Sequence, residues 1–100
     1  MICALTVRKL RPGTFDRFRE AFMAHAQPDN LPEGWLRFDM LRNAEHPDEV
    51  ICFGFFETDV VGMRAKAAQG GYAEQQAAIA PFVESVGADG LYEIEEELTP

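Results

Sequence analysis

The sequence contains few of the residues that build metal and redox sites. Two cysteines and two histidines occur in 100 residues, and none has the spacing of a structural zinc site. Cys3 and Cys52 each lie in an apolar stretch, which predicts buried thiols; a disulfide would need both side chains on the same face of adjacent strands. No glycine-rich loop follows a predicted strand, so no phosphate-binding loop is indicated. We therefore expect no bound metal and no cofactor.

Basic residues and long apolar runs are also scarce. Nine Lys and Arg against 17 Asp and Glu give a net charge of −8. Nucleic-acid backbones and anionic membranes are bound through clustered cations, so we expect neither as a partner. The longest apolar runs, residues 50–56 and 77–83, are far shorter than the roughly 20 residues of a membrane-spanning helix. Residues 1–4 carry no basic segment of an export signal, which predicts a cytoplasmic protein.

The apolar residues that are present predict the secondary structure. They make up 47% of the sequence, which suits a single domain over residues 1–100. Thr14 is expected to cap the first helix, and Thr58 or Asp59 the second. Alternating and helical spacing of apolar residues predicts strands at residues 2–10, 35–43, 49–57 and 91–98 and helices at residues 15–26, 60–69 and 72–86.

The order of these elements predicts an α+β fold. Right-handed crossovers turn a βαββαβ chain into a ferredoxin-like, four-stranded antiparallel sheet with the helices on one face and strands one and three in the centre. Residues 49–57 are apolar on both faces of their strand, with Val50 and Cys52 on one and Phe53 and Phe55 on the other. Helices on one face leave the other apolar face uncovered. We therefore expect a second copy to cover it, as a homodimer.

Several short segments resemble those of the antibiotic biosynthesis monooxygenase-like domain. They are Arg-Pro-Gly at residues 11–13 before an amphipathic helix, Pro-Glu-Gly-Trp at 32–35, Phe-Phe-Glu-Thr at 55–58 ending an aromatic strand, and Gly-Tyr at 71–72. The resemblance extends over nearly the whole chain. It implies a dimeric α/β barrel, in which the sheets of two ferredoxin-like subunits pack face to face. It also implies an apolar pocket between the helices and the sheet of each subunit.

The resemblance carries an expectation of function. Some members of the family oxidise polycyclic aromatic substrates with molecular oxygen and without metal or flavin, which implies a cofactor-independent monooxygenase acting on an aromatic or quinone-like small molecule. Haem-degrading members hold the iron with a histidine from the helix after the third strand. Residues 59–86 contain no histidine, which disfavours haem degradation. The alternative is a non-catalytic small-molecule-binding or stress-related dimer that keeps the scaffold without the chemistry.

Two polar residues are candidates for catalysis in this pocket. Tyr72 matches a pocket residue of the family, and its phenol would donate a hydrogen bond to a quinone or phenolate oxygen; the alternative is an aromatic residue packing at a helix start. His25 follows the aromatic stripe of the first helix and would act as a general base, although a histidine at a helix C-terminus is also stabilised by the dipole alone. The pocket itself is expected to be lined by Phe22, Trp35, Phe56 and Met63, with Trp35 at its mouth or packed on a helix end.

Overall fold

The computed structural model describes residues 1–27, 31, 33–68 and 71–100. The order of strands and helices along the chain is largely the one that the apolar spacing predicts. In chain order the elements are β1 (Ile2–Leu10), α1 (Phe15–His25), β2 (Trp35–Arg42), β3 (Glu49–Phe56), α2 (Val60–Ala67), α3 (Tyr72–Ile79), the 3-10 helix η2 (Ala80–Phe82) and β4 (Val83–Glu93). The first three strands lie within one residue of their predicted bounds.

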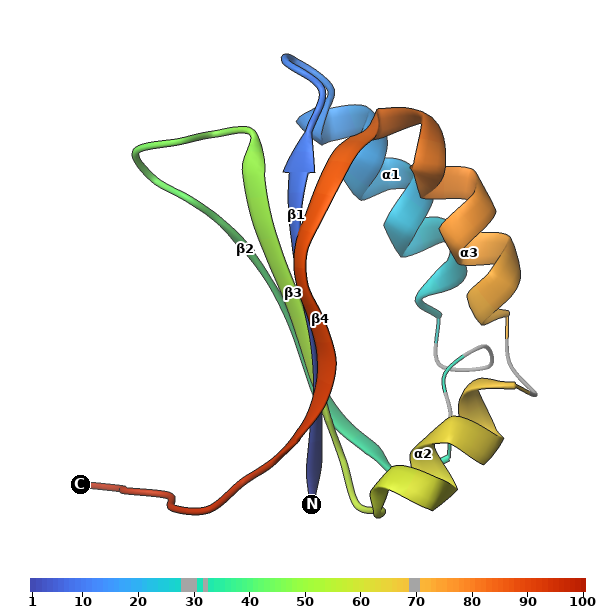
Figure 1. The fold of residues 1–100 in the computed structure, drawn as a ribbon, viewed down its shortest axis with the longest axis vertical. Helices are drawn as coiled ribbons and strands as arrows, with labels where there is room; N and C mark the ends of the chain where they lie inside the picture. The colour runs from blue at the N-terminus through green and yellow to red at the C-terminus, as the bar shows by residue number, and fades with distance from the viewer. Residues whose placement is uncertain (28–30, 32, 69–70) are drawn as a thin grey trace.

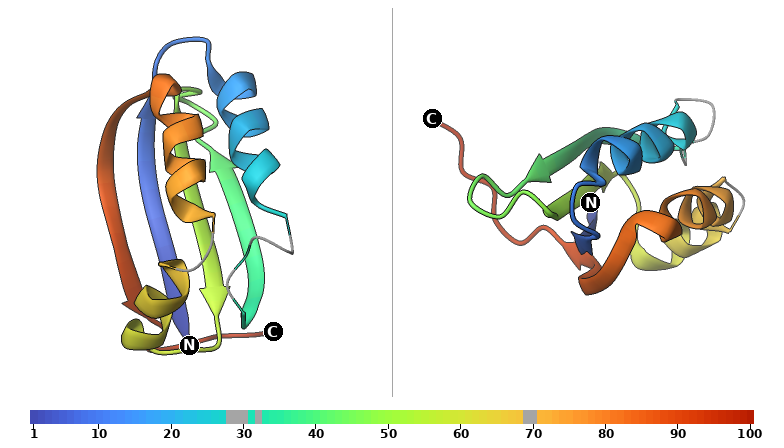
Figure 2. Two further views of the ribbon diagram at one scale, coloured as in Figure 1. Left: turned by 90° about the vertical axis from the view of Figure 1, so that its right-hand side faces the viewer. Right: turned by 90° about the horizontal axis from the view of Figure 1, so that it is seen from above.

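The four strands form one antiparallel sheet in the order β2-β3-β1-β4. All the helices lie on one side of it, and the other side is open (Figure 1). Viewed from the helical side, α1 and α3 cover the upper part of the sheet and α2 the lower part (Figure 2). This arrangement confirms the predicted ferredoxin-like βαββαβ fold, with β1 and β3 in the centre.

Strand β3 alternates strictly between the two faces of the sheet. Val50, Cys52, Gly54 and Phe56 are buried beneath the helices, whereas Ile51, Phe53 and Phe55 are half-buried on the open face. Phe53 and Phe55 pack edge to face there, with ring centroids 5.6 Å apart. Strand β3 is therefore apolar on both faces, as the sequence predicts. The second copy that we expect to cover the open face stays a prediction.

The end of the chain differs from its prediction. The helix predicted over residues 72–86 stops at Ile79, and the strand predicted over 91–98 instead begins at Val83 and ends at Glu93. Pro81 explains the early stop, because proline has no N–H to donate and its ring clashes with the preceding turn of an α-helix. Residues 87–90, predicted as a turn, belong to β4 at a shift of its register against β1.

Local signals at the helix starts are only partly confirmed. Asp59 caps α2, and its carboxylate accepts a hydrogen bond from the Gly62 N–H at 2.7 Å. Thr14 occupies the capping position of α1, but its hydroxyl donates to the Arg11 carbonyl at 2.7 Å instead of accepting from the helix. Both cysteines are free thiols. They lie on opposite faces of the sheet, Cys52 beneath the helices and Cys3 opposite Phe55 on the open face, so they cannot pair with each other.

Candidate functional site

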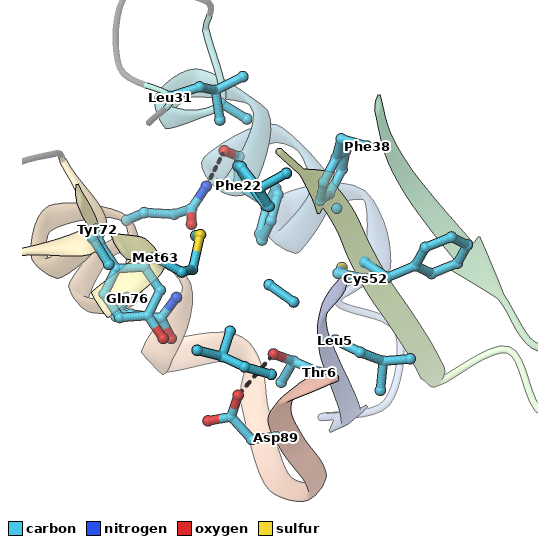
Figure 3. A pocket seen from close by; sticks show the side chains of 18 of the residues that line it. Leu5, Thr6, Phe22, Leu31, Phe38, Cys52, Met63, Tyr72, Gln76 and Asp89 are labelled. Atoms are coloured by element: carbon cyan, nitrogen blue, oxygen red, sulfur yellow. Dashed lines mark hydrogen bonds between the residues drawn. The ribbon is translucent and has the colours of Figure 1, made fainter. Parts of the chain in front are cut away.

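A cavity of about 410 Å³ lies between the sheet and the helices (Figure 3). It separates two clusters of buried apolar side chains. The upper cluster, under α1 and α3, includes Phe22 and Cys52; the lower cluster, under α2, includes Phe56 and Met63. All four of these residues line the cavity. The volume is in the range of small-molecule binding sites, and the walls are mostly apolar, as such sites require.

Small residues on the two central strands leave this space open. Ala4 of β1 and Gly54 of β3 are directly paired and line the cavity beneath the helices, and Thr6 lines it one step further along β1. Gly54 has no side chain, and the Phe56 ring lies back over it, 3.0 Å from where a Cβ would stand. Glycine inside a strand often marks such a close approach. The floor of the cavity is thus set by the lack of bulk in the middle of the sheet.

The structure brings together most of the residues predicted for the pocket. Phe22, Phe56 and Met63 line the cavity and are 6–7% exposed. Figure 3 shows Phe22, Met63 and Tyr72 among the side chains around the cavity. Trp35 is not among the described residues that line it; it begins the edge strand β2, is 38% exposed, and pairs with Phe56, which lines the cavity in its place.

His25 reaches the cavity from the last turn of α1. Its Nδ1 lies 3.2 Å from the Ala21 carbonyl oxygen. A carbonyl oxygen only accepts, so this bond requires a proton on Nδ1 and leaves the Nε2 of the neutral ring as an acceptor. The contact explains the position of the ring without catalysis and also defines which nitrogen is free to take a proton.

Tyr72 begins α3 and is half exposed, which places its phenol at the boundary between the cavity and solvent. The two glutamines that follow it on the same helix connect α3 to its neighbours. The Gln75 amide donates to the Phe22 carbonyl at 3.2 Å, and the Gln76 amide oxygen accepts from Arg8 at 3.5 Å. The wall that carries Tyr72 is thereby held against both α1 and β1.

Sequence reasoning did not place two buried side chains with polar atoms, Arg8 and Cys52, in the cavity wall. Arg8 is 4% exposed and Cys52 is 5% exposed, and both line the cavity. Burial raises the pKa of the Cys52 thiol to about 11, although the nearby Arg8 guanidinium opposes the shift. A signal was present in the sequence, because Arg8 occupies the same strand face as Ile2, Ala4 and Leu10, where a charged residue is out of place.

The described residues form neither a metal site nor a membrane-spanning helix. No three His, Cys, Asp or Glu side chains there converge as metal ligands would. No helix in the described part of the chain is both long enough and apolar enough to cross a membrane.

No protein-family model and no curated protein matches the sequence. The fold, in contrast, matches solved structures over almost its full length. SnoaB, a cofactor-independent oxygenase from Streptomyces nogalater, superposes with a TM-score of 0.81 at 17% identity, covering 99% of this chain and 97% of SnoaB. A candidate antibiotic biosynthesis monooxygenase from Nitrosomonas europaea gives a TM-score of 0.77 at 16% identity, covering 96% of this chain and 100% of that one. Rv0793 from Mycobacterium tuberculosis gives 0.77 at 15% identity, covering 98% of each chain.

These matches confirm the resemblance at the level of the fold. The chain has the fold of the antibiotic biosynthesis monooxygenase structures from its first strand to its last. Identities of 15–17% do not transfer a substrate or a set of catalytic residues.

Proposed function

We propose that the protein is a cofactor-independent monooxygenase that oxidises an aromatic or quinone-like small molecule in the cavity between sheet and helices. The observation that carries the proposal is the cavity itself. Its apolar walls suit a planar aromatic ring, and Tyr72 and His25 reach it from two different helices. The fold that the chain shares with SnoaB, described as a cofactor-independent oxygenase, supports the same reading.

An anthrone illustrates the chemistry that such a site would perform. Its CH2 group is acidic because the carbanion is delocalised onto the ring ketone as a phenolate. The free Nε2 of His25 would take that proton, and the Tyr72 hydroxyl would donate a hydrogen bond to the oxygen that becomes negative. The carbanion then reduces O2, so one oxygen atom becomes the new carbonyl and the other leaves as water with the two CH2 hydrogens. The protein would supply orientation, proton transfer and exclusion of water.

We also propose that two copies pack through their open sheet faces as a homodimer. Apolar side chains from all four strands gather on this face, namely Cys3, Leu5, Val7, Leu41, Ile51, Phe53, Phe55 and Tyr92. Soluble monomers rarely expose a continuous apolar surface of this kind, and twofold dimers are the commonest way to bury one.

Oxygen consumption tests the catalytic proposal. The purified protein should consume O2 with at least one member of a panel of anthrones and hydroquinones, faster than buffer alone. Tyr72→Phe should lower that rate about 10- to 100-fold, since it removes one hydrogen bond to a developing negative charge. Tyr92→Phe is the matched control, because Tyr92 lies on the open face and should leave the rate unchanged.

The outcomes separate the two candidate functions. No oxygen consumption across the panel, together with saturable binding of the same compounds, would support the non-catalytic binding protein instead. An equal rate in Tyr72→Phe and Tyr92→Phe would remove Tyr72 from the catalytic site while leaving the activity itself established.

A further inference from the structure

Arg8 is the most deeply buried charge at the cavity. It lies on β1, on the face covered by the helices, and only 4% of its surface is exposed. The guanidinium carbon stands 5.9 Å from the ring centroids of both Phe18 and Phe22. Arginine cannot lose its proton in a protein interior, so a full positive charge remains in this apolar setting.

The guanidinium lacks the partners that a buried charge requires. Its Nη1 has no hydrogen-bond partner among the described residues, and its Nη2 donates to the Gln76 amide oxygen at 3.5 Å, the outer limit of a hydrogen bond. In the described part of the chain, no carboxylate comes within 4.0 Å of it, and the ion pairs found are those of Lys9 and Arg37 elsewhere.

The lack of a carboxylate partner is particular to the surroundings of Arg8, because acidic residues outnumber basic ones 17 to 9 in the sequence. The neighbouring Cys52 thiol does not supply the missing charge either. Burial outweighs the lowering effect of the Arg8 charge and side-chain contact and raises the thiol pKa to about 11. An unpaired buried charge is costly. A protein that keeps one beside a ligand-sized cavity gains from it only when a ligand brings the counter-charge.

We propose that Arg8 binds an anionic oxygen of the ligand, and that the ligand is therefore an aromatic carboxylate. The proposal rests on the proposed function, since it specifies which aromatic molecules the cavity selects. The carboxylate accepts from the guanidinium in place of the distant Gln76 amide, and the ring extends toward Phe56 and Met63 at the opposite, apolar end. Asp89 is the acidic residue in the described lining. Its carboxylate accepts a hydrogen bond from the Thr6 hydroxyl at 3.1 Å and forms no ion pair with Arg8.

A pair of nearly identical probes isolates the charge. We expect the wild-type protein to bind 2-naphthoate at least tenfold more tightly than 2-naphthamide in titration calorimetry, since a hydrogen bond to a charged group is worth more than about 1.4 kcal/mol here. Arg8→Met should abolish the preference and leave naphthamide binding unchanged, and Arg8→Lys should retain part of it. Arg19→Gln is the matched control, because Arg19 is an exposed arginine of α1 outside the described lining and should leave the preference intact. Arg64→Gln tests the other arginine of the lining, and loss of the preference in that variant would overturn the assignment to Arg8.

Stability distinguishes this role from a structural one. Replacing an unpaired buried charge by a side chain of similar volume is neutral or stabilising, so Arg8→Met should keep or raise the melting temperature. A large fall in melting temperature with an unchanged preference for naphthoate would overturn the proposal. If Arg8→Met does not fold, the proposal is still tested by the two probes on the wild type and on Arg64→Gln. Loss of the preference for naphthoate in Arg64→Gln would show that Arg64 and not Arg8 binds the carboxylate.

Failure of this inference and failure of the proposed function give different results. Equal binding of the two probes by the wild-type protein overturns the role of Arg8 and leaves the cavity and its oxidation chemistry standing. A clear preference for naphthoate without oxygen consumption supports Arg8 and rejects the monooxygenase. Binding of neither probe overturns the role of Arg8, and together with no oxygen consumption across the anthrone and hydroquinone panel it rejects both.

Discussion

Burial determines the chemistry of individual residues in this protein more than their identity does. The His25 ring contacts the Ala21 carbonyl, the Arg8 guanidinium lies against two aromatic rings, and burial raises the pKa of the Cys52 thiol. The thiol offers a test of burial that is independent of any ligand. Its raised pKa means that the native state holds the proton more tightly than the unfolded chain does.

The Cys52 thiol should make stability depend on pH in the alkaline range. Because its pKa rises from 9.0 to about 11 on folding, its contribution is complete below pH 9 and is lost as the pH rises to about 11. We expect the difference in free energy of unfolding between wild type and Cys52→Ala to shrink by about 2 to 3 kcal/mol between about pH 8 and about pH 11. Urea unfolding at fixed protein concentration measures it.

Cys3→Ala is the control for this titration, because Cys3 lies on the open face and is less deeply buried. Its difference from wild type should change less over the same range. A difference for Cys52→Ala that is constant with pH would show that the thiol ionises equally in the folded and unfolded states.

Among the elements, α2 is a short helix that is held at both ends by side-chain hydrogen bonds. It has eight residues and two of them, Met63 and Arg64, line the cavity. Isolated helices this short are not stable in water, so capping and packing must hold α2 in place. Asp59 satisfies the Gly62 N–H at the start, and Lys66 near the end donates to the Glu33 carbonyl at 2.7 Å.

Removing the α2 cap should destabilise the protein. We expect Asp59→Ala to lower the free energy of unfolding by about 1 kcal/mol, because the side chain no longer satisfies a helix N–H. Asp59→Asn should stay within a few tenths of a kcal/mol of wild type, because asparagine caps equally well. Urea unfolding of the three proteins measures the effect, and equal losses in both variants would show that charge and not capping matters there.

At the scale of the whole molecule, the sheet has one face covered by helices and one left open (Figure 1). On this open face, Phe53 and Phe55 of β3 lie beside the aliphatic and thiol side chains of β1, the other central strand. Helices from the same chain do not reach it. The apolar side chains of the open face therefore affect how copies of the chain assemble as well as how stable the sheet is.

The open face should hold two copies together. We expect light scattering to give twice the 11.2 kDa of one chain for the wild type, and the mass of one chain for Phe55→Asp, which places a charge in the centre of the face. Val61→Asp should stay dimeric, because Val61 is 77% exposed on α2, on the other side of the sheet. A wild-type mass of one chain at micromolar concentration would contradict the dimer.

The sequence by itself determined the fold class and most of the element bounds. Strand β3 is apolar at every position between Val50 and Phe56 except Gly54, so it had to lie in the centre of a sheet. Proline, glycine and the capping Asp59 then marked where elements begin and end. Such signals are local, and a chain of this length has room for few topologies that satisfy them.

Only the tertiary structure decided the cavity and the last strand. The apolar spacing through Val86 predicted a helix, but Pro81 ends the helix early. The residues from Val83 on instead pair with β1 and form the edge strand of the sheet. Periodicity assigned Phe22, Phe56 and Met63 to one interior but could not tell whether they fill it. Whether the two apolar clusters meet depends on the distance between the helices and the sheet, where Ala4 and Gly54 on the covered face leave the space open. That distance depends on many contacts between residues far apart in the chain, and a local sequence pattern does not contain this information.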